Sequence, residues 1–205
     1  MGSLKKVLVA SSNPKKVREI EEILRPLGIE VVKPPRPLEV EEWANTFFGN
    51  AYLKAKAYYE AFGIPALADD SGLVVEALKP YPGVYSARFY SLEEFGKEEP
   101  VPSADAANVR KLLRALEGKT DRRAKFVSAV VLYAGEGKVL AAEGEVEGTI
   151  VGEPRGGGGF GYDPVFVPKG FEQTFAEMEP SLKHSLSHRG KALRRLAELL
   201  KNCDL

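Results

Sequence analysis

The chain has 205 residues, of which 44% are hydrophobic and 28% charged, a composition that excludes a disordered or fibrous protein. Its 29 basic and 29 acidic residues cancel, which excludes a protein held to nucleic acid or to an anionic membrane by bulk charge. Cys203 is the single cysteine, so the chain cannot form an intrachain disulfide and a reducing compartment is expected.

The first residues of a chain can carry signals that direct a protein to a membrane or out of the cell. Residues 1–6 lack the apolar segment of a signal peptide, and Lys6 stands where a myristoylation signal requires Ser or Thr. No apolar run approaches the length needed to span a membrane. We therefore expect a cytoplasmic protein that binds neither membrane nor nucleic acid.

The first predicted strand, residues 6–10, is an apolar run that ends in a polar turn. A helix should follow, with Asn13 as its N-cap and Pro14 at its first position. The turn would direct backbone N–H groups, hydroxyls and lysines at one point, which suits a phosphate at a helix N-terminus. A well-capped surface helix with solvated lysines is the alternative. The residues of this turn are Ser11, Ser12, Asn13, Pro14, Lys15 and Lys16.

A second strand is predicted at residues 29–32, followed by a proline-rich loop and an acidic run at residues 39–42. Thr46 can cap the next helix, which carries Lys54 among apolar residues at helical spacing. A glutamate run of this kind is usually a solvated face.

The apolar residues 66–68 stop at two adjacent carboxylates, Asp69 and Asp70. This pattern predicts a strand that delivers acid to the edge of a sheet. Successive strand side chains point to opposite faces, so both acids reach one pocket only if the pleat breaks, and Ser71 and Gly72 are expected to break it. One acid should react and the other should support it. A polar turn in which Asp caps its own backbone is the alternative.

The middle of the chain predicts further sheet and helix. A polar excursion at residues 91–102 precedes a helix at residues 103–117. Residues 126–133 form the next predicted strand, and residues 138–150 return as its antiparallel partner after a glycine-rich turn. The sheet is therefore expected to be mixed.

Four successive glycines at residues 156–159 lose conformational entropy that a simple connector would keep, so we expect something to approach the backbone there. Gly156, Gly158 and Gly161 match a dinucleotide-binding pattern. That pattern must follow a strand and open a helix, whereas residues 163–168 predict a strand. We therefore reject a dinucleotide site.

The aromatic residues after these glycines suggest contact with a base. Phe160 and Tyr162, beside Asp163, suit stacking on a flat base and hydrogen bonding to its edge. The alternative is an aromatic anchor that fixes a flexible loop to the core.

The last predicted helix begins after Ser187, its natural N-cap. His188 and Arg189 then occupy its first turn, where a cation is unfavourable unless an anion or a polar ligand lies beside it. Neither histidine has a partner at zinc-ligand spacing, so hard oxygen ligands for magnesium are favoured.

Together, six segments closely resemble the inosine triphosphate pyrophosphatase family, which hydrolyses non-standard purine nucleoside triphosphates. The segments are residues 11–16, 50–55, 68–73, 82–88, 158–164 and 187–192. The resemblance implies an α/β fold, with an elongated mixed β-sheet, flanking helices and two lobes around a nucleotide cleft. It also implies a single nucleoside triphosphate pyrophosphatase domain over residues 1–205, assembled as a homodimer.

The resemblance implies roles for individual residues. Glu42 and Asp70 would hold Mg²⁺, Asp70 would also be the catalytic proton acceptor, and Asp69 would buttress it. Phe160 resembles the ring that stacks on the base. The residues expected to contact substrate are Ser11, Ser12, Asn13, Pro14, Lys15, Lys16, Lys54, Ser71, Phe160, Gly161, Tyr162, Asp163, Lys183, His188 and Arg189.

The chain departs from the family pattern at Gly49. The family pattern Thr-Phe-x-Glu-Asn places a glutamate there, and its loss removes an acid and half of a capping box. Any role of that acid in metal binding must be dispensable here or pass to Glu41 or Glu42.

The implied reaction is attack of water on the α-phosphorus of dITP, ITP or XTP, which gives a nucleoside monophosphate and pyrophosphate and cleanses the nucleotide pool. Arg189 or a backbone N–H would bond the 6-keto group, where adenine carries a donor amine. A non-catalytic nucleotide-binding regulator is one alternative, although it gains nothing from paired acids unless it needs a metal. A related pyrimidine nucleotide pyrophosphatase is another, but that class lacks the Ser-His-Arg ending.

Overall fold

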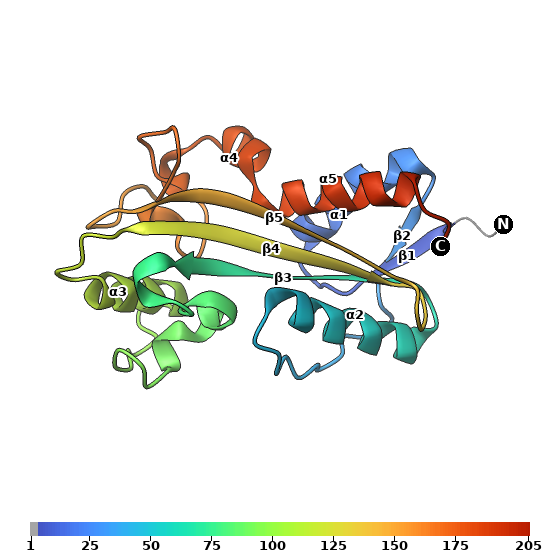
Figure 1. The fold of residues 1–205 in the computed structure, drawn as a ribbon, viewed down its shortest axis with the longest axis horizontal. Helices are drawn as coiled ribbons and strands as arrows, with labels where there is room; N and C mark the ends of the chain where they lie inside the picture. The colour runs from blue at the N-terminus through green and yellow to red at the C-terminus, as the bar shows by residue number, and fades with distance from the viewer. Residues whose placement is uncertain (1–3) are drawn as a thin grey trace. The chain divides into compact units, whose positions relative to one another are not determined.

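The computed structural model describes residues 4–205, so the expectation drawn from residues 1–3 lies outside the described part of the chain. Six strands form one sheet in the order β2-β1-β3-β4-β5-β6 (Figure 1). β1 pairs in parallel with β2 and β3, whereas β5 and β6 are antiparallel. The predicted α/β fold with a mixed sheet is therefore confirmed.

The elements follow one another as the sequence periodicity predicts, with additional short helices. The strands are β1 (Lys6–Val9), β2 (Glu30–Val32), β3 (Ala66–Val75), β4 (Arg123–Tyr133), β5 (Val139–Ile150) and β6 (Phe166–Pro168). The α-helices are α1 (Pro14–Leu24), α2 (Phe47–Phe62), α3 (Ala104–Ala115), α4 (Pro180–Leu186) and α5 (His188–Lys201). The 3₁₀ helices are Arg25–Leu27, Glu76–Leu78, Gly83–Ser91, Asp163–Val165 and Phe175–Glu177. No described helix is both long enough and apolar enough to cross a membrane.

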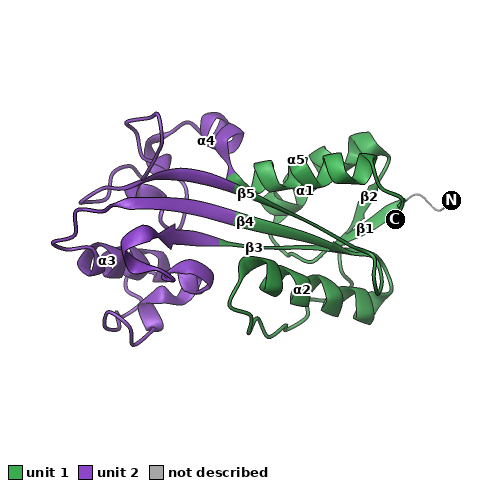
Figure 2. Cartoon of the chain, viewed as in Figure 1, with its two compact units in different colours: residues 1–71, 128–144, 188–205 green, residues 72–127, 145–187 purple. Residues whose placement is uncertain are grey.

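The chain divides into two compact units (Figure 2). Unit 1 comprises residues 1–71, 128–144 and 188–205. Unit 2 comprises residues 72–127 and 145–187. Strands β3, β4 and β5 each contribute residues to both units.

In unit 1, alternate strand residues build an apolar core on each face of the sheet. Val7 and Val9 of β1 pack with α1 and α5, whereas Leu8 and Ala10 pack with α2. Figure 1 shows α1 and α5 on one side of these strands and α2 on the other. Because both faces are covered by helices, β1 reads as a continuous apolar run.

The same alternation continues along β3. Leu67 lies in the core with α1 and α5, whereas Ala66 and Ala68 lie in the core with α2. The two-residue period of a strand therefore directs Asp69 towards α1 and α5 and Asp70 towards α2.

The predicted N-caps of unit 1 are confirmed by their hydrogen bonds. Asn13 Oδ1 accepts from the backbone N–H groups of Lys15 and Lys16, at 3.0 and 3.4 Å. Thr46 Oγ1 accepts from Gly49 N at 3.0 Å. These bonds fix where α1 and α2 begin, and thus where their charged side chains lie.

Unit 2 has its own core, in which the rings of Phe126 and Phe166 lie 4.5 Å apart between centroids. Lys111 is fully buried there, and its ammonium donates to the carbonyl oxygens of Phe89 and Leu92, both at 2.7 Å. These bonds satisfy a buried charge and anchor the start of the polar excursion after residue 91.

Two sequence expectations about these elements were wrong, and one helix was missed. β3 does not break at Ser71 and Gly72, because pairing within the sheet carries the strand on to Val75. The strand predicted at residues 163–168 begins only at Phe166, since Pro164 has no N–H and Val165 N bonds Tyr162 O in a 3₁₀ turn. The short helix α4 was not predicted.

Candidate functional site

Asp69 is the buried acid of β3, on the face covered by α1 and α5. Its Oδ1 lies 2.9 Å from Lys16 Nζ, and its Oδ2 lies 3.6 Å from Arg189 Nε. Burial alone would raise the pKa of Asp69, but the charges of Lys16 and Arg189 outweigh it and lower the pKa below its usual range. Asp69 is therefore an ionised, ion-paired group, which suits a supporting role.

A second carboxylate completes this buried cluster. Glu19, with a side chain only 8% exposed, accepts from Arg189 Nη1 at 3.2 Å. Two acidic and two basic side chains from α1, β3 and α5 thus lie together. The carboxylates of Glu19 and Asp69 offset the unfavourable interaction of the Arg189 charge with the helix dipole at the N-terminus of α5. Sequence reasoning missed Glu19. The available signal was its position three residues after Lys16, on the same face of α1.

Asp70 occupies the opposite face, beside α2. Asn50 Nδ2 donates to Asp70 Oδ2 at 3.4 Å. Burial, together with the negative charge of Glu42, raises the pKa of Asp70 to about 6, although Lys54 and Asn50 act in the other direction. Asp70 is thus an acid whose proton exchanges near neutral pH, as expected of a group that reacts.

Lys54 connects Glu42 to the backbone of β3. Its Nζ contacts Glu42 Oε1 at 3.0 Å and the backbone oxygen of Asp69 at 3.2 Å. Burial alone would lower the pKa of Lys54, but the charges of Glu42 and Asp69 outweigh it and raise the pKa. Lys54 therefore stays protonated between two acids.

Glu42 and Asp70 are the carboxylates that the sequence predicts as magnesium ligands. In the part of the chain that is described, no three His, Cys, Asp or Glu side chains gather where they could hold a metal ion. Mg²⁺ is commonly bound by one or two carboxylates and completes its shell with water and phosphate oxygens. Glu42 and Asp70, whose charges interact, supply two carboxylates for such a site.

The turn before α1 already uses part of its hydrogen-bonding capacity. Asn13 N donates to Ser11 Oγ at 3.1 Å, and Asn13 itself caps the N–H groups of Lys15 and Lys16. The Lys16 ammonium is directed at Asp69, whereas Lys15 and Ser12 are exposed. Both sequence interpretations therefore describe part of the turn: it is a well-capped helix start, and it presents exposed polar groups.

In unit 2, the two aromatic residues have different surroundings. Phe160 is 68% exposed, and Lys183 Nζ lies 4.6 Å from the centre of its ring. Lys183 also pairs with Asp163, which accepts from Phe160 N at 3.0 Å. Tyr162 is buried and its hydroxyl donates to Ser86 O at 2.6 Å. The ring of Phe160 is thus exposed, whereas Tyr162 is an anchor.

The chain itself approaches the four glycines of unit 2. A Cβ on Gly156 would lie 2.6 Å from the carbonyl carbon of Ala176, and Gly158 N donates to Ala176 O at 3.0 Å. A Cβ on Gly159 would lie 2.2 Å from Asp163 Oδ2. The close approach expected from the sequence is present, and it fixes the loop that carries Phe160.

The remaining predicted residues are placed as follows. Ser71 is half-buried on β3, and His188 is half-buried at the first position of α5. Gly161 N donates to Asp105 Oδ2 at 2.9 Å.

Gly144 allows the start of α5 to lie close to β5, since a Cβ there would be 2.3 Å from His188 O.

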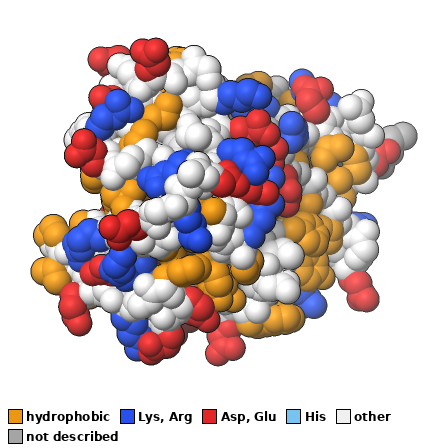
Figure 3. Space-filling model, turned by 60° about the vertical axis from the view of Figure 1, so that its left-hand side comes forward, with side chains coloured by type: hydrophobic (Ala, Val, Ile, Leu, Met, Phe, Trp, Pro, Cys, Tyr) orange, Lys and Arg blue, Asp and Glu red, His pale blue; other side chains and the backbone are white. Residues whose placement is uncertain are grey.

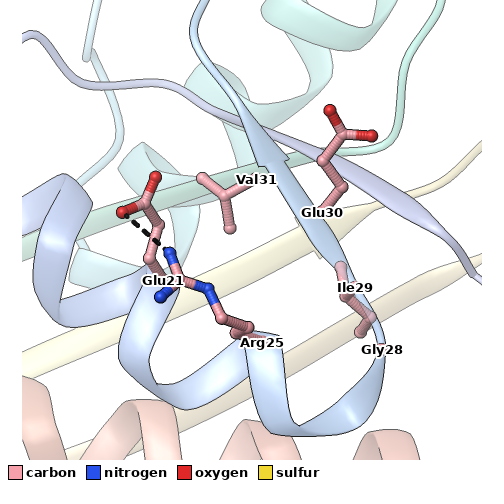
Figure 4. Close-up of a pocket in the computed structure, with 6 residues that line it drawn as sticks. All are labelled: Glu21, Arg25, Gly28, Ile29, Glu30 and Val31. Carbon is pink, nitrogen blue, oxygen red and sulfur yellow. Dashed lines mark ion pairs between the residues drawn. The ribbon is translucent and has the colours of Figure 1, made fainter.

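Two surface hollows in the described part of the chain lie apart from these residues. One, of about 310 Å³, lies beside α1 and β2 and includes Arg25, paired with Glu21 at 3.7 Å (Figure 4). The other lies beside Val151 and Arg155. Neither contains a predicted site residue.

Figure 3 shows acidic and basic side chains interspersed over one face of the surface, in keeping with the zero net charge.

Comparison with known proteins gives consistent matches over almost the whole chain. The model of the Ham1 family matches residues 7–199. The dITP/XTP pyrophosphatase of Aquifex aeolicus is 59% identical over 199 residues, which cover 97% of this chain and 98% of that protein. The dITP/XTP pyrophosphatase of Hydrogenobaculum sp. is 51% identical and covers 96% of this chain and 98% of its own length.

Solved structures agree with the sequence matches. A HAM1 protein from Coxiella burnetii has a TM-score of 0.85 and 38% identity, with 98% of this chain and 100% of that chain covered. The Ham1 protein of Staphylococcus aureus has a TM-score of 0.84 and 34% identity, with 97% and 99% covered. The mixed sheet is thus that of a known class of α/β proteins. The chain belongs to the Ham1 family.

Replacing Asp70 by Asn tests its charge through stability. The pKa of Asp70 is about 6 in the folded chain, against an ordinary value of 3.8 for the unfolded chain. Between these two pH values the folded state therefore binds the Asp70 proton more tightly than the unfolded state does. Ionisation of Asp70 therefore lowers the free energy of unfolding as the pH rises through this window. In urea unfolding without metal, we expect Asp70→Asn to exceed the wild type in stability at about pH 7, and the difference to shrink towards about pH 4. A difference that grows towards low pH would contradict this assignment.

Proposed function

We propose that this chain hydrolyses non-standard purine nucleoside triphosphates, dITP, ITP and XTP, to the nucleoside monophosphate and pyrophosphate. The observation that carries the proposal is that β3 places two adjacent acids in different surroundings. Asp69 pairs with Lys16 and Arg189, whereas Asp70 lies beside Asn50 and has its pKa raised to about 6. Relatives with 59% and 51% identity carry the name dITP/XTP pyrophosphatase. Removal of such nucleotides would cleanse the nucleotide pool.

Asp70 is the proposed proton acceptor for the attacking water. A general base works best when its pKa lies close to the working pH, and the pKa of Asp70 is about 6 in the metal-free chain. A carboxylate bound to Mg²⁺ is a weaker base, so in the loaded site Asp70 would act mainly by orienting the water. Asp69 supports it by holding Lys16 and Arg189 on the other face of β3.

Glu42 and Asp70 are the residues that would hold Mg²⁺. When bound, the ion would neutralise negative charge that develops on the pyrophosphate leaving group. Lys54 adds positive charge at the same face and holds Glu42 in place through its ion pair. Both carboxylates and the lysine belong to unit 1.

The triphosphate contacts are proposed for the turn before α1 and for Lys54. Lys15 and Ser12 have exposed side chains that can reach an anion without breaking an existing contact. Lys16 would have to share its ammonium between Asp69 and a phosphate, and an ammonium with three donors can do so. The turn consists of Ser11, Ser12, Asn13, Pro14, Lys15 and Lys16.

Base recognition is proposed first for residues of unit 2. Phe160 offers its exposed ring for stacking, and Lys183 and Asp163 lie beside that ring. Tyr162 would contact substrate through its backbone, because Ser86 O occupies its hydroxyl. The other proposed contacts are Gly161, Ser71, His188 and Arg189.

Arg189 is proposed to bond the 6-keto oxygen while it stays anchored. A guanidinium has five N–H donors, and the contacts with Glu19 and Asp69 involve Nη1 and Nε. We further propose that the chain acts as one domain over residues 1–205, as a homodimer in the cytoplasm.

The position of bond cleavage tests this function. In H₂¹⁸O with dITP and Mg²⁺, attack at the α-phosphorus gives dIMP that carries the label and pyrophosphate that does not. We expect this pattern by mass spectrometry and ³¹P NMR, with Asp70→Asn as the matched inactive control. Orthophosphate and dIDP as first products would contradict the proposed reaction, and label in pyrophosphate would contradict α-phosphorus attack.

The stacking role of Phe160 is tested against a second exposed ring of the same unit. Base stacking on an aromatic side chain is worth about 1–3 kcal/mol, so Phe160→Ala should lower kcat/KM for dITP by about 5- to 150-fold. Phe160→Tyr should restore it, and Phe171→Ala should leave it within about twofold. Equal effects of Phe160→Ala and Phe171→Ala would remove Phe160 from base recognition.

A further inference from the structure

The first turn of α2 lies very close to the segment that carries Glu42. We call residues 39–45 the acidic segment. A Cβ on Gly49 would lie 2.7 Å from Ala44 Cβ and 2.9 Å from Thr46 Oγ1, closer than real Cβ atoms approach such neighbours. Gly is a poor helix former, so its presence inside the first turn is explained by this contact. Gly49 therefore lets the acidic segment pack against α2.

Asn50 joins the acidic segment to β3. Its side-chain Oδ1 accepts from Ala44 N at 2.9 Å, while its Nδ2 donates to Asp70 Oδ2 at the longer distance of 3.4 Å. The residue is only 3% exposed. A buried side-chain amide is fixed by hydrogen bonds to both its oxygen and its nitrogen. The Asn50 side chain therefore fixes the acidic segment relative to Asp70.

Lys54 provides a second connection beside the first. It follows Asn50 by four residues, and side chains at this spacing lie on the same face of a helix. Lys54 Nζ joins Glu42 Oε1 at 3.0 Å to the backbone oxygen of Asp69 at 3.2 Å. Two neighbouring side chains of α2 thus connect alternate residues of the acidic segment to adjacent residues of β3.

We propose that Asn50 is a positioning residue, which together with Gly49 holds the acidic segment so that Glu42 serves the same site as Asp70. The inference deepens the proposed function and rests on it. It also accounts for the departure at Gly49: the acidic segment occupies the space that a side chain at this position would need, and Glu42 supplies the second carboxylate.

The two ends of the Asn50 amide can be tested separately. Asn50→Ala removes both bonds. Asn50→Asp keeps an acceptor for Ala44 N but replaces the donor facing Asp70 with a negatively charged oxygen. Thr46→Ala is the matched control, because it removes the N-cap of α2 and leaves both bonds of Asn50 intact.

Trp43 gives a readout that needs neither substrate nor metal. It is the single tryptophan of the chain, lies within the acidic segment between Glu42 and Ala44, and is 76% exposed. Its fluorescence anisotropy therefore reports how firmly the segment is held. We expect a lower anisotropy in Asn50→Ala, and wild-type values in Asn50→Asp and Thr46→Ala.

Steady-state kinetics then distinguish a positioning role of Asn50 from a contribution to the stability of the fold alone. With dITP and Mg²⁺, we expect Asn50→Ala and Asn50→Asp to lower kcat by about tenfold or more with KM within about threefold, and Thr46→Ala to keep the wild-type kcat. Gly49→Ala should lower both kcat and the Trp43 anisotropy, although Ala is the better helix former.

Two outcomes would overturn the inference. One is wild-type anisotropy in Asn50→Ala, which would mean that Asn50 does not hold the segment. The other is an equal loss of kcat in Asn50→Ala and Thr46→Ala, which would reduce Asn50 to a structural role. Failure of the proposed function is distinguishable, because a wild-type chain that releases no pyrophosphate would leave the anisotropy results unchanged.

Discussion

The two-residue repeat of β3 separates Asp69 and Asp70 onto opposite faces of the sheet, and the chemistry of unit 1 depends on that separation. Both faces are covered by helices, so each acid meets a different set of side chains. Asp69 meets Lys16 of α1 and Arg189 of α5, whereas Asp70 meets Asn50 of α2. Two adjacent and chemically identical acids thereby acquire different pKa values.

This separation makes the two helical layers serve different purposes. On one face, buried ion pairs among four side chains lock α1, β3 and α5 together, and removal of any one partner would leave a buried charge uncompensated. On the other face, the negative charge of Glu42 raises the pKa of Asp70 although Lys54 pairs with Glu42, which leaves negative charge for a cation to relieve. The first face is suited to holding Lys16 and Arg189 in place, and the second to binding a cation.

Local patterns in the sequence predicted the elements but not all the contacts between them. Apolar periodicity and capping residues such as Asn13 and Thr46 determine where helices begin, so the α/β fold could be predicted. The resemblance supplied the candidate residues. Glu19 and the continuous strand through Ser71 were missed, because burial beside Arg189 and pairing inside the sheet depend on residues distant in sequence. The roles assigned to Phe160 and Arg189 remain predictions.

The most direct test of the account compares Asp69→Asn with Asp70→Asn. The account predicts that Asp70→Asn lowers kcat at least about a hundredfold while it folds as stably as the wild type at neutral pH or more so. Asp69→Asn should instead destabilise the fold, by roughly 3–5 kcal/mol in urea unfolding, because it leaves Lys16 and Arg189 without their shared carboxylate. Near-normal turnover in Asp70→Asn, or unchanged stability in Asp69→Asn, would contradict it.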